Sequence, residues 1–431
     1  MRISFISLFF LLFSQLAFSA ANIQSWQTSQ GSDVFFVETK GLPMVDVRVI
    51  FDAGSARDGF QHGISALTSA LLDTGAGNWS ADDIAQRFES VGAQFGAGVS
   101  RDMAWVSVRS LTEEKLLNKA LKTVGVILNT PAFNETDFQR EKSRTLAGLK
   151  HREESPGALA GIEFFKTLYK DHPYAHASSG NVETVSGFSA NDLRSFYQQY
   201  YVAKNAKIVI VGDLNKQQAM QVAQSLISGL NTGTKPEILP QVPLPAKGVT
   251  KHINFPSTQT HVLAGLVGMH RKDKDYLSLY VGNHILGGSG LVSQLFGEVR
   301  EKRGLAYSAY SYFSPLFRNG PFTMGLQTRN DQTTQAVEVM LNTLESFVEK
   351  GPTEDALIAA KKNITGGFAM RFDTNSKLVS YVSMIGFYQL PLDYLDTFQQ
   401  RVEAVTVASI KDAFKRRVRP EFINTITVGG N

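Results

Sequence analysis

The fold of this chain is most restricted by a local pattern that occurs twice, 217 residues apart. Each copy begins with a hydroxyl residue, Ser189 or Thr406, and ends in an apolar run closed by glycine, at 208–212 and 425–429. Such a hydroxyl can cap the start of a helix, and a short β-branched run is typical of a strand. The pattern predicts a duplicated unit of about 210 residues, the alternative being two helix–strand pairs that are similar by chance.

A second pair of similar segments, at 134–149 and 353–368, is 219 residues apart and supports the same duplication. The stretch 231–250 contains four of the 14 prolines, two glycines and little helical periodicity, which is typical of an extended linker. We therefore expect an N-terminal unit at 22–230, this linker, and a C-terminal unit at 251–431.

The order of predicted elements in the first unit indicates the fold class. Segments 45–49 and 104–108 alternate between apolar and polar residues, as half-buried strands do, and helical patterns lie between them. The order of strand, two helices, two strands, several helices and a closing strand favours a mostly antiparallel sheet with helices on one face. The predicted class is α+β.

Composition limits the chemistry that the chain can perform. Its 431 residues include no cysteine, which excludes disulfides, thiolate nucleophiles and cysteine-bound zinc. Any metal would need histidines and carboxylates as ligands. The net charge of +4 is spread along the chain, and no basic run carries interleaved aromatic residues, so we expect no nucleic-acid partner.

The first residues resemble a targeting segment. A positive start at Met1–Arg2 precedes an apolar run at 3–16 and the small residues Ala17, Ser19 and Ala20. This pattern predicts a secretory signal peptide at 1–21, too short for a stable membrane span. After cleavage we expect a chain that is exported, is not bound to a membrane and, in a Gram-negative host, is periplasmic.

The segment 286–307 carries the most specific pattern in the chain. It predicts a helix, a glycine turn, a second helix, a turn at Gly304 and a strand, with Arg300 and Tyr307 on either side of one turn. A glycine loop before a helix could bind phosphate, but no Lys-Ser/Thr follows and no buried strand precedes it. Glycines that allow two helices to approach closely are the favoured interpretation.

Within this segment, Leu-Gly-Gly, Ser-Gln-Leu-Phe and Arg-Glu-Lys-Arg-Gly-Leu-Ala-Tyr resemble the C-terminal signature of the pitrilysin/insulinase (inverzincin) metallopeptidases. The resemblance extends over 34–430. It implies two homologous α+β halves that face each other like a clam around a peptide. It also implies that Tyr307 stabilises the oxyanion of the tetrahedral intermediate and that Arg300 holds the substrate backbone, both in trans, in a site completed by a partner subunit.

The same resemblance locates the zinc motif His-x-x-Glu-His just after Gly63, and the third ligand on a later helix. In this chain the corresponding positions are Ala66, Ser69, Ala70 and Gly148. Alanine and glycine offer no lone pair, and a neutral serine is a poor ligand, so we expect no metal in this chain. Zinc is expected in the partner subunit instead.

The histidines offer no replacement ligands. His62 precedes the degenerate helix, and we expect it to be an exposed loop residue because no partner lies at helical spacing. His172 and His176 are four residues apart, but Pro173 argues against a regular helix that would place them on one face. The resemblance also implies an edge strand at 94–98 that pairs with the bound peptide through Gly96 and Ala97. A glycine bulge or turn there is the alternative.

These observations lead to a hypothesis with two alternatives. The chain is expected to be an exported non-catalytic subunit that lends Arg300 and Tyr307 to a zinc-bearing homologous subunit for peptide hydrolysis. The first alternative is a structural or peptide-binding protein of the same fold with no role in catalysis. The second is an independent zinc peptidase with displaced ligands.

Overall fold

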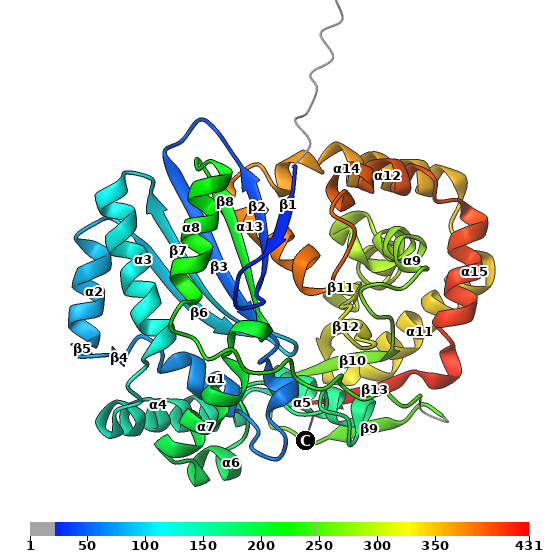
Figure 1. Ribbon diagram of the computed structural model, residues 1–431. Coiled ribbons are helices and arrows are strands. Elements are labelled where there is room, and N and C mark those ends of the chain that lie inside the picture. The colour runs from blue at the N-terminus through cyan, green and yellow to red at the C-terminus, as the bar shows by residue number, and fades with distance from the viewer. Residues whose placement is uncertain (1–21, 245–246, 431) are drawn as a thin grey trace, which may run out of the picture.

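The computed structural model describes residues 22–244 and 247–430, so the predicted signal peptide lies outside the described residues. It contains two α+β halves side by side (Figure 1), which confirms the predicted fold class. Within the described ranges, no helix combines the length and apolar character needed to cross a lipid bilayer.

The first half contains a six-stranded sheet in the order β1-β2-β8-β3-β7-β6, in which β2 and β8 are parallel and the other pairs antiparallel. The strands are β1 (Gln24–Gln27), β2 (Asp33–Glu38), β3 (Met44–Phe51), β6 (Gln94–Val99), β7 (Ala104–Leu111) and β8 (Ala206–Gly212). The helices are α1 (Ile64–Ala70), α2 (Ala81–Glu89), α3 (Glu114–Asn129), α4 (Glu135–Glu153), α5 (Pro156–Tyr169), α6 (Val182–Gly187), α7 (Ala190–Tyr200) and α8 (Lys216–Ile227). A short hairpin joins β4 (Gly75–Ala76) and β5 (Trp79–Ser80).

The second half contains a five-stranded sheet in the order β11-β12-β10-β13-β9, in which β13 and β9 are parallel. Its strands are β9 (Thr250–Ile253), β10 (Gln259–Val267), β11 (Ala306–Phe313), β12 (Pro321–Arg329) and β13 (Asn424–Val428). Its helices are α9 (Tyr276–Asn283), α10 (Gln294–Phe296), α11 (Thr333–Lys350), α12 (Glu354–Gly366), α13 (Asn375–Phe387), α14 (Tyr394–Glu403) and α15 (Val407–Arg417).

The repeated pattern forms the same structure in both halves. Ser189 caps α7 and Thr406 caps α15, each with a reciprocal hydrogen bond from the third residue of the helix. Helix α7 is followed by β8, which pairs in parallel with β2. Helix α15 is followed by β13, which pairs in parallel with β9. The helix–strand pairs predicted from sequence are therefore confirmed.

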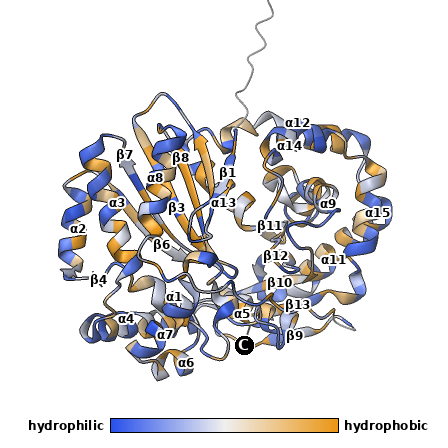
Figure 2. Cartoon of the chain, viewed as in Figure 1, coloured by the Kyte–Doolittle hydropathy of each residue, from blue (hydrophilic) through white to orange (hydrophobic). Residues whose placement is uncertain are grey.

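Strand β8 is apolar along its length because it is buried on both faces. Ile208 and Ile210 pack on one side against helices of the first half, while Val209 and Val211 belong to a core shared with the second half. Figure 2 shows β8 as predominantly hydrophobic. A strand that contacts two cores needs a continuous apolar run rather than an alternating one.

The two halves exchange one helix each. Helix α5 of the first half packs on β10 and β13, where Phe164 contacts the second sheet, and α13 of the second half packs on β3 and β8. A glycine makes room at each contact: an added Cβ would lie 2.9 Å from Phe164 at Gly265, and 2.6 Å from Phe35 at Gly386. The exchange covers the second face of both sheets.

A buried carboxylate also joins the halves. Asp102, 2% exposed, accepts hydrogen bonds from the hydroxyls of Tyr174 (2.5 Å) and Tyr388 (2.8 Å) and from the Phe317 N–H (2.8 Å). Burial raises the pKa of this carboxyl, while the three donors act in the opposite direction. Because two of the donors belong to the second half, the carboxylate fixes the two halves against each other.

The segment at 231–249 contains no helix or strand among its described residues, and it is held to both halves. Arg57 of the first half donates to the Glu237 carbonyl (2.7 Å), and Arg318 of the second donates to the Leu239 carbonyl (2.6 Å). His172 bonds the Pro240 carbonyl through Nε2 (3.1 Å). The segment is extended but anchored.

We predict that His172 makes the stability of the protein sensitive to acid. Its Nδ1 accepts from the Tyr174 N–H (3.1 Å), so the ring must be neutral, and burial lowers its pKa from the usual 6.5. A lowered pKa means that this contribution is complete above pH 6.5 and is lost as the pH falls further. The difference in unfolding free energy between wild type and His172→Gln, measured by urea denaturation, should therefore shrink between about pH 7.5 and pH 5.5. Parallel pH profiles would contradict this role.

Candidate functional site

The degenerate helix α1 starts at a tight junction between two loops. Gly63 has φ 97°, and an added Cβ would lie 2.8 Å from the Ser179 carbonyl oxygen. The Asp58 carboxylate accepts from the N–H groups of Gly63 (2.7 Å) and Ser65 (3.1 Å) and so satisfies the first turn. Asp58 and Gly63 together determine where α1 begins.

The four positions predicted for zinc ligands lie on α1 and α4, which contact each other. Ala66 is half-buried, Ser69 is buried, and Ala70 and Gly148 are exposed. None has a side chain that can bind a metal. In the ranges that the structure describes, no group of three or more His, Asp or Glu side chains could hold a metal ion.

Two carboxylates lie on or next to the helices that carry these positions. Glu141 on α4 is 3.6 Å from Arg140 and 3.9 Å from Arg144 in ion pairs. Asp73 follows α1, and its pKa is raised by burial and by the negative charge of Glu141. The raised pKa means that the Asp73 carboxyl is protonated more readily than a carboxyl exposed to solvent.

His62 lies in a loop, as expected, but it is half-buried rather than exposed, so that part of the expectation is wrong. Its ring stacks on that of His176 with centroids 4.0 Å apart, and His176 Nε2 bonds Asp58 Oδ2 (3.2 Å). Burial and the charge of His176 lower the pKa of His62. The two histidines join the loop before α1 to the loop after α5. No spacing in the sequence indicates this contact.

The Arg300–Tyr307 turn is formed by a π-helical turn (Gly297–Glu301), Gly304 and the start of β11. Gly304 has φ 63°, a conformation that favours glycine, and its N–H donates to the Arg300 carbonyl (2.9 Å). The Arg300 guanidinium lies 4.9 Å from the centroid of the Tyr307 ring. The structure thus brings these two predicted residues together.

A bulge aims Tyr307 away from the sheet. Ala306 pairs with Thr328 and Ala309 with Leu326, so β11 has one more residue than β12 over this interval. Tyr307 is 81% exposed, and Arg300 is also exposed. Both polar groups are available to a molecule that approaches from solvent.

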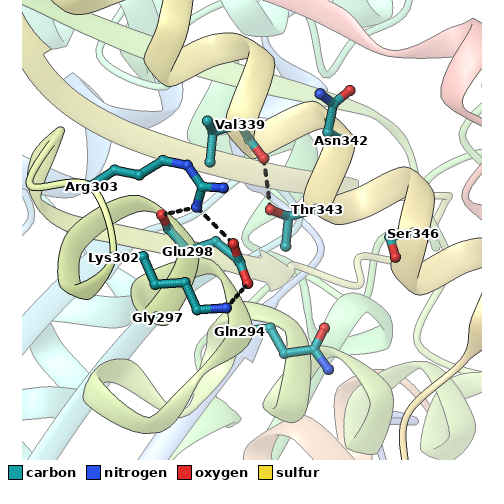
Figure 3. Close-up of a pocket in the computed structure, with 9 residues that line it drawn as sticks. All are labelled: Gln294, Gly297, Glu298, Lys302, Arg303, Val339, Asn342, Thr343 and Ser346. Atoms are coloured by element: carbon teal, nitrogen blue, oxygen red, sulfur yellow. Dashed lines mark hydrogen bonds and ion pairs between the residues drawn. The ribbon is translucent and has the colours of Figure 1, made fainter.

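Two of the three basic side chains of the turn form ion pairs with a carboxylate. Glu298 lines a cavity of about 500 Å³ and forms ion pairs with Lys302 (2.6 Å) and Arg303 (2.7 Å). Figure 3 shows the three side chains beside one another. These pairs stabilise the turn from one side. Among the described residues, no carboxylate lies within ion-pair distance of Arg300. Arg300 is therefore the cation of this turn that remains available to bind a ligand.

The glycines before the turn act in packing, as favoured from sequence, although their neighbour is a strand rather than a second helix. An added Cβ at Gly287 would lie 2.3 Å from the Ser311 hydroxyl of β11, and one at Gly288 would lie 2.8 Å from the Asn283 amide. Asn283 also exchanges side-chain hydrogen bonds with Ser311. This close approach holds the helix against the strand that carries Tyr307.

Gly96 and Ala97 lie on β6, the edge strand of the first sheet. Gly96 pairs with Ser107 and Ala97 with Val106, without a register shift, so the alternative of a bulge or turn is wrong. The strand packs beside α1, which places the edge and the degenerate zinc positions in one region. The Arg300–Tyr307 turn belongs to the other half and packs against α11.

Comparison with known proteins gives two matches to family models. Residues 34–180 match the family described as "Insulinase (Peptidase family M16)". Residues 187–364 match "Peptidase M16 inactive domain". The two matches divide the chain close to the point where α7 begins.

Individual relatives and solved structures agree with these matches. An "uncharacterized zinc protease" of Rickettsia bellii is 27% identical, with 77% of this chain and 80% of that protein covered. A "non-peptidase homolog" of Helicobacter pylori is 26% identical, with 91% and 90% covered.

The crystal structure of a peptidase M16 inactive domain from Pseudomonas fluorescens is 36% identical, with a TM-score of 0.92 and coverage of 95% and 98%. The chain belongs to peptidase family M16, the insulinase family.

Proposed function

We propose that this chain is an exported, non-catalytic subunit of a heteromeric zinc peptidase. A homologous partner subunit holds the zinc and its water. This chain contributes Arg300 and Tyr307 to the partner's site, where they act on a bound peptide. In a Gram-negative host the complex is periplasmic, in agreement with the signal-like pattern at 1–21.

The observation that carries the proposal is the contrast between the two sites. The helix that would hold zinc has Ala66, Ser69 and Ala70 in place of ligands. Arg300 and Tyr307, in contrast, lie next to each other and are exposed, and Tyr307 lies in the bulge of β11. A phenol hydroxyl and a guanidinium can both donate to the oxygen on which negative charge develops during amide hydrolysis. Such donors have a catalytic use when a metal-bound water is supplied by another subunit.

The edge strand supports a peptide as the substrate. Strand β6, which contains Gly96 and Ala97, pairs with β7 on one side and forms the edge of its sheet on the other. An extended peptide can pair with such an edge through main-chain hydrogen bonds. The relatives bear both protease and non-peptidase names.

We predict that Arg300 and Tyr307 are required for peptide hydrolysis by the assembled pair. With the chain co-expressed with a zinc-bearing homologue from the same host, Tyr307→Phe should lower kcat by roughly 10²–10³-fold because one oxyanion donor is lost. Arg300→Ala should raise KM as well, since it removes a substrate contact. Arg329→Gln, which breaks an exposed ion pair with Asp331, is the matched control and should retain activity.

Unchanged activity in both variants would contradict the shared site. It would favour the alternative that the chain is a structural or peptide-binding protein of the same fold. Co-purification of the two subunits in every variant, measured by size-exclusion chromatography, separates loss of chemistry from loss of assembly.

We also predict that zinc binding can be restored. Nothing lies within 4 Å of a Cβ added at Gly148, and Ala70 is exposed, so larger side chains fit. The variant Ala66→His/Ala70→His/Gly148→Glu should retain about one zinc per chain after dialysis, measured by atomic absorption, because two imidazoles and a carboxylate complete a ligand set.

Wild type and the control Ala66→His/Ala70→His should retain far less zinc than the triple variant. A triple variant that folds normally by circular dichroism but binds no more zinc than wild type would show that these positions do not form the former metal site.

A further inference from the structure

A second cavity lies in the second half between α9, α13 and α14. It has a volume of about 300 Å³ and reaches the surface at Ser380. Its lining combines aromatic rings with two guanidinium groups, namely Arg271, Tyr276, Tyr280, Phe368, Arg371, Ser380, Tyr381, Met384, Tyr394 and Phe398.

The aromatic side chains form ordered walls. Tyr276 and Tyr280 on α9 stack with centroids 5.9 Å apart and planes 10° from parallel. Phe368 and Phe398 stack at 4.4 Å and 14°. Tyr394 packs against Phe398 at 6.0 Å. Flat walls of this kind accept a planar or bulky apolar group.

The two arginines of the cavity contact phenols rather than carboxylates. Arg371 donates to the Tyr280 hydroxyl (2.8 Å), and Arg271 lies 5.7 Å from the Tyr276 ring and 5.5 Å from the Tyr388 ring. Among the described residues, neither has an acidic group within 4.0 Å. The Arg271 Nε atom is buried and has no hydrogen-bond partner.

Two other arginines of the second half are paired with carboxylates instead. Arg416 binds Asp275 (2.8 Å), and Arg417 binds both Asp273 (2.7 Å) and Asp275 (2.9 Å). Leaving the positive charges of two part-buried guanidiniums uncompensated beside one cavity is unfavourable unless an anion binds there. A carboxylate is the anion whose shape matches the guanidinium fork.

We propose that this cavity binds an aromatic carboxylate, with the acid group on Arg271 and Arg371 and the ring between the tyrosine and phenylalanine walls. The volume suits a ligand of small-molecule size. Two sources share this chemistry: a free aryl-alkyl acid, and the C-terminal residue of a peptide that ends in an aromatic amino acid. The inference does not depend on the proposed role of Arg300 and Tyr307.

A matched pair of ligands tests the proposal on the full mature chain. Isothermal titration calorimetry with N-acetyl-phenylalanine should give a Kd of about 1 mM or tighter, while N-acetyl-phenylalanine amide, which lacks the carboxylate, should bind at least tenfold more weakly. Acetate, which lacks the ring, should also bind at least tenfold more weakly. Equal affinity of acid and amide, or no binding of the acid at about 10 mM, would overturn the proposal.

Variants locate the binding. Arg371→Gln and Arg271→Gln should each weaken the acid tenfold to a hundredfold, because a charge-assisted hydrogen bond is lost. Arg401→Gln is the matched control: Arg401 stacks on Tyr394 at 5.7 Å but does not line the cavity, so affinity should not change. Equal binding by wild type and both cavity variants would place the ligand elsewhere and overturn the assignment.

Two further ligands distinguish the sources. If peptides are the natural ligands, an acetylated tetrapeptide that ends in phenylalanine should bind more tightly than 3-phenylpropionate. If free acids are, 3-phenylpropionate should bind at least as tightly. Either order supports the aromatic-carboxylate site provided that the amide control binds weakly, and absence of binding by both would overturn it.

Discussion

The exchange of α5 and α13 between the halves is the constraint on which the rest of the structure depends. Each helix covers the second face of the other half's sheet, so neither sheet can be completed by its own half. The buried Asp102 carboxylate, bound by donors from both halves, adds a polar contact that tolerates little displacement. The relative position of the β6 edge and the Arg300–Tyr307 turn is therefore fixed by packing within one chain.

Local features of the fold could be predicted from the sequence because their causes are local. The helix caps at Ser189 and Thr406 and the bend at Gly304 each follow from residues within a few positions. The positions predicted for zinc ligands and the Arg300–Tyr307 pair follow from the fixed spacing of the family motifs, and their roles remain predictions. The pairing of Arg300 with Tyr307 across one turn is likewise a short-range property.

Contacts between distant segments could not be predicted. His176 is more than a hundred residues from His62, and no periodic pattern indicates that their rings stack. The exchanged helices have apolar faces like any buried helix, so their sequence does not say which sheet they cover. The cavity of Arg271 and Arg371 depends on helices that meet only in the folded state. An arginine in a sequence gives no sign of whether a carboxylate will lie beside it.

We propose that catalysis is divided between two subunits: this chain supplies the donors for an oxyanion, and a homologous partner supplies the metal. The most direct test is to purify the mature chain free of other proteins, supply zinc, and follow a mixture of unstructured peptides by mass spectrometry. The peptides should remain intact, because the chain alone lacks a set of ligands for the metal. Cleavage that co-elutes with the chain and stops when a chelator removes zinc would contradict it.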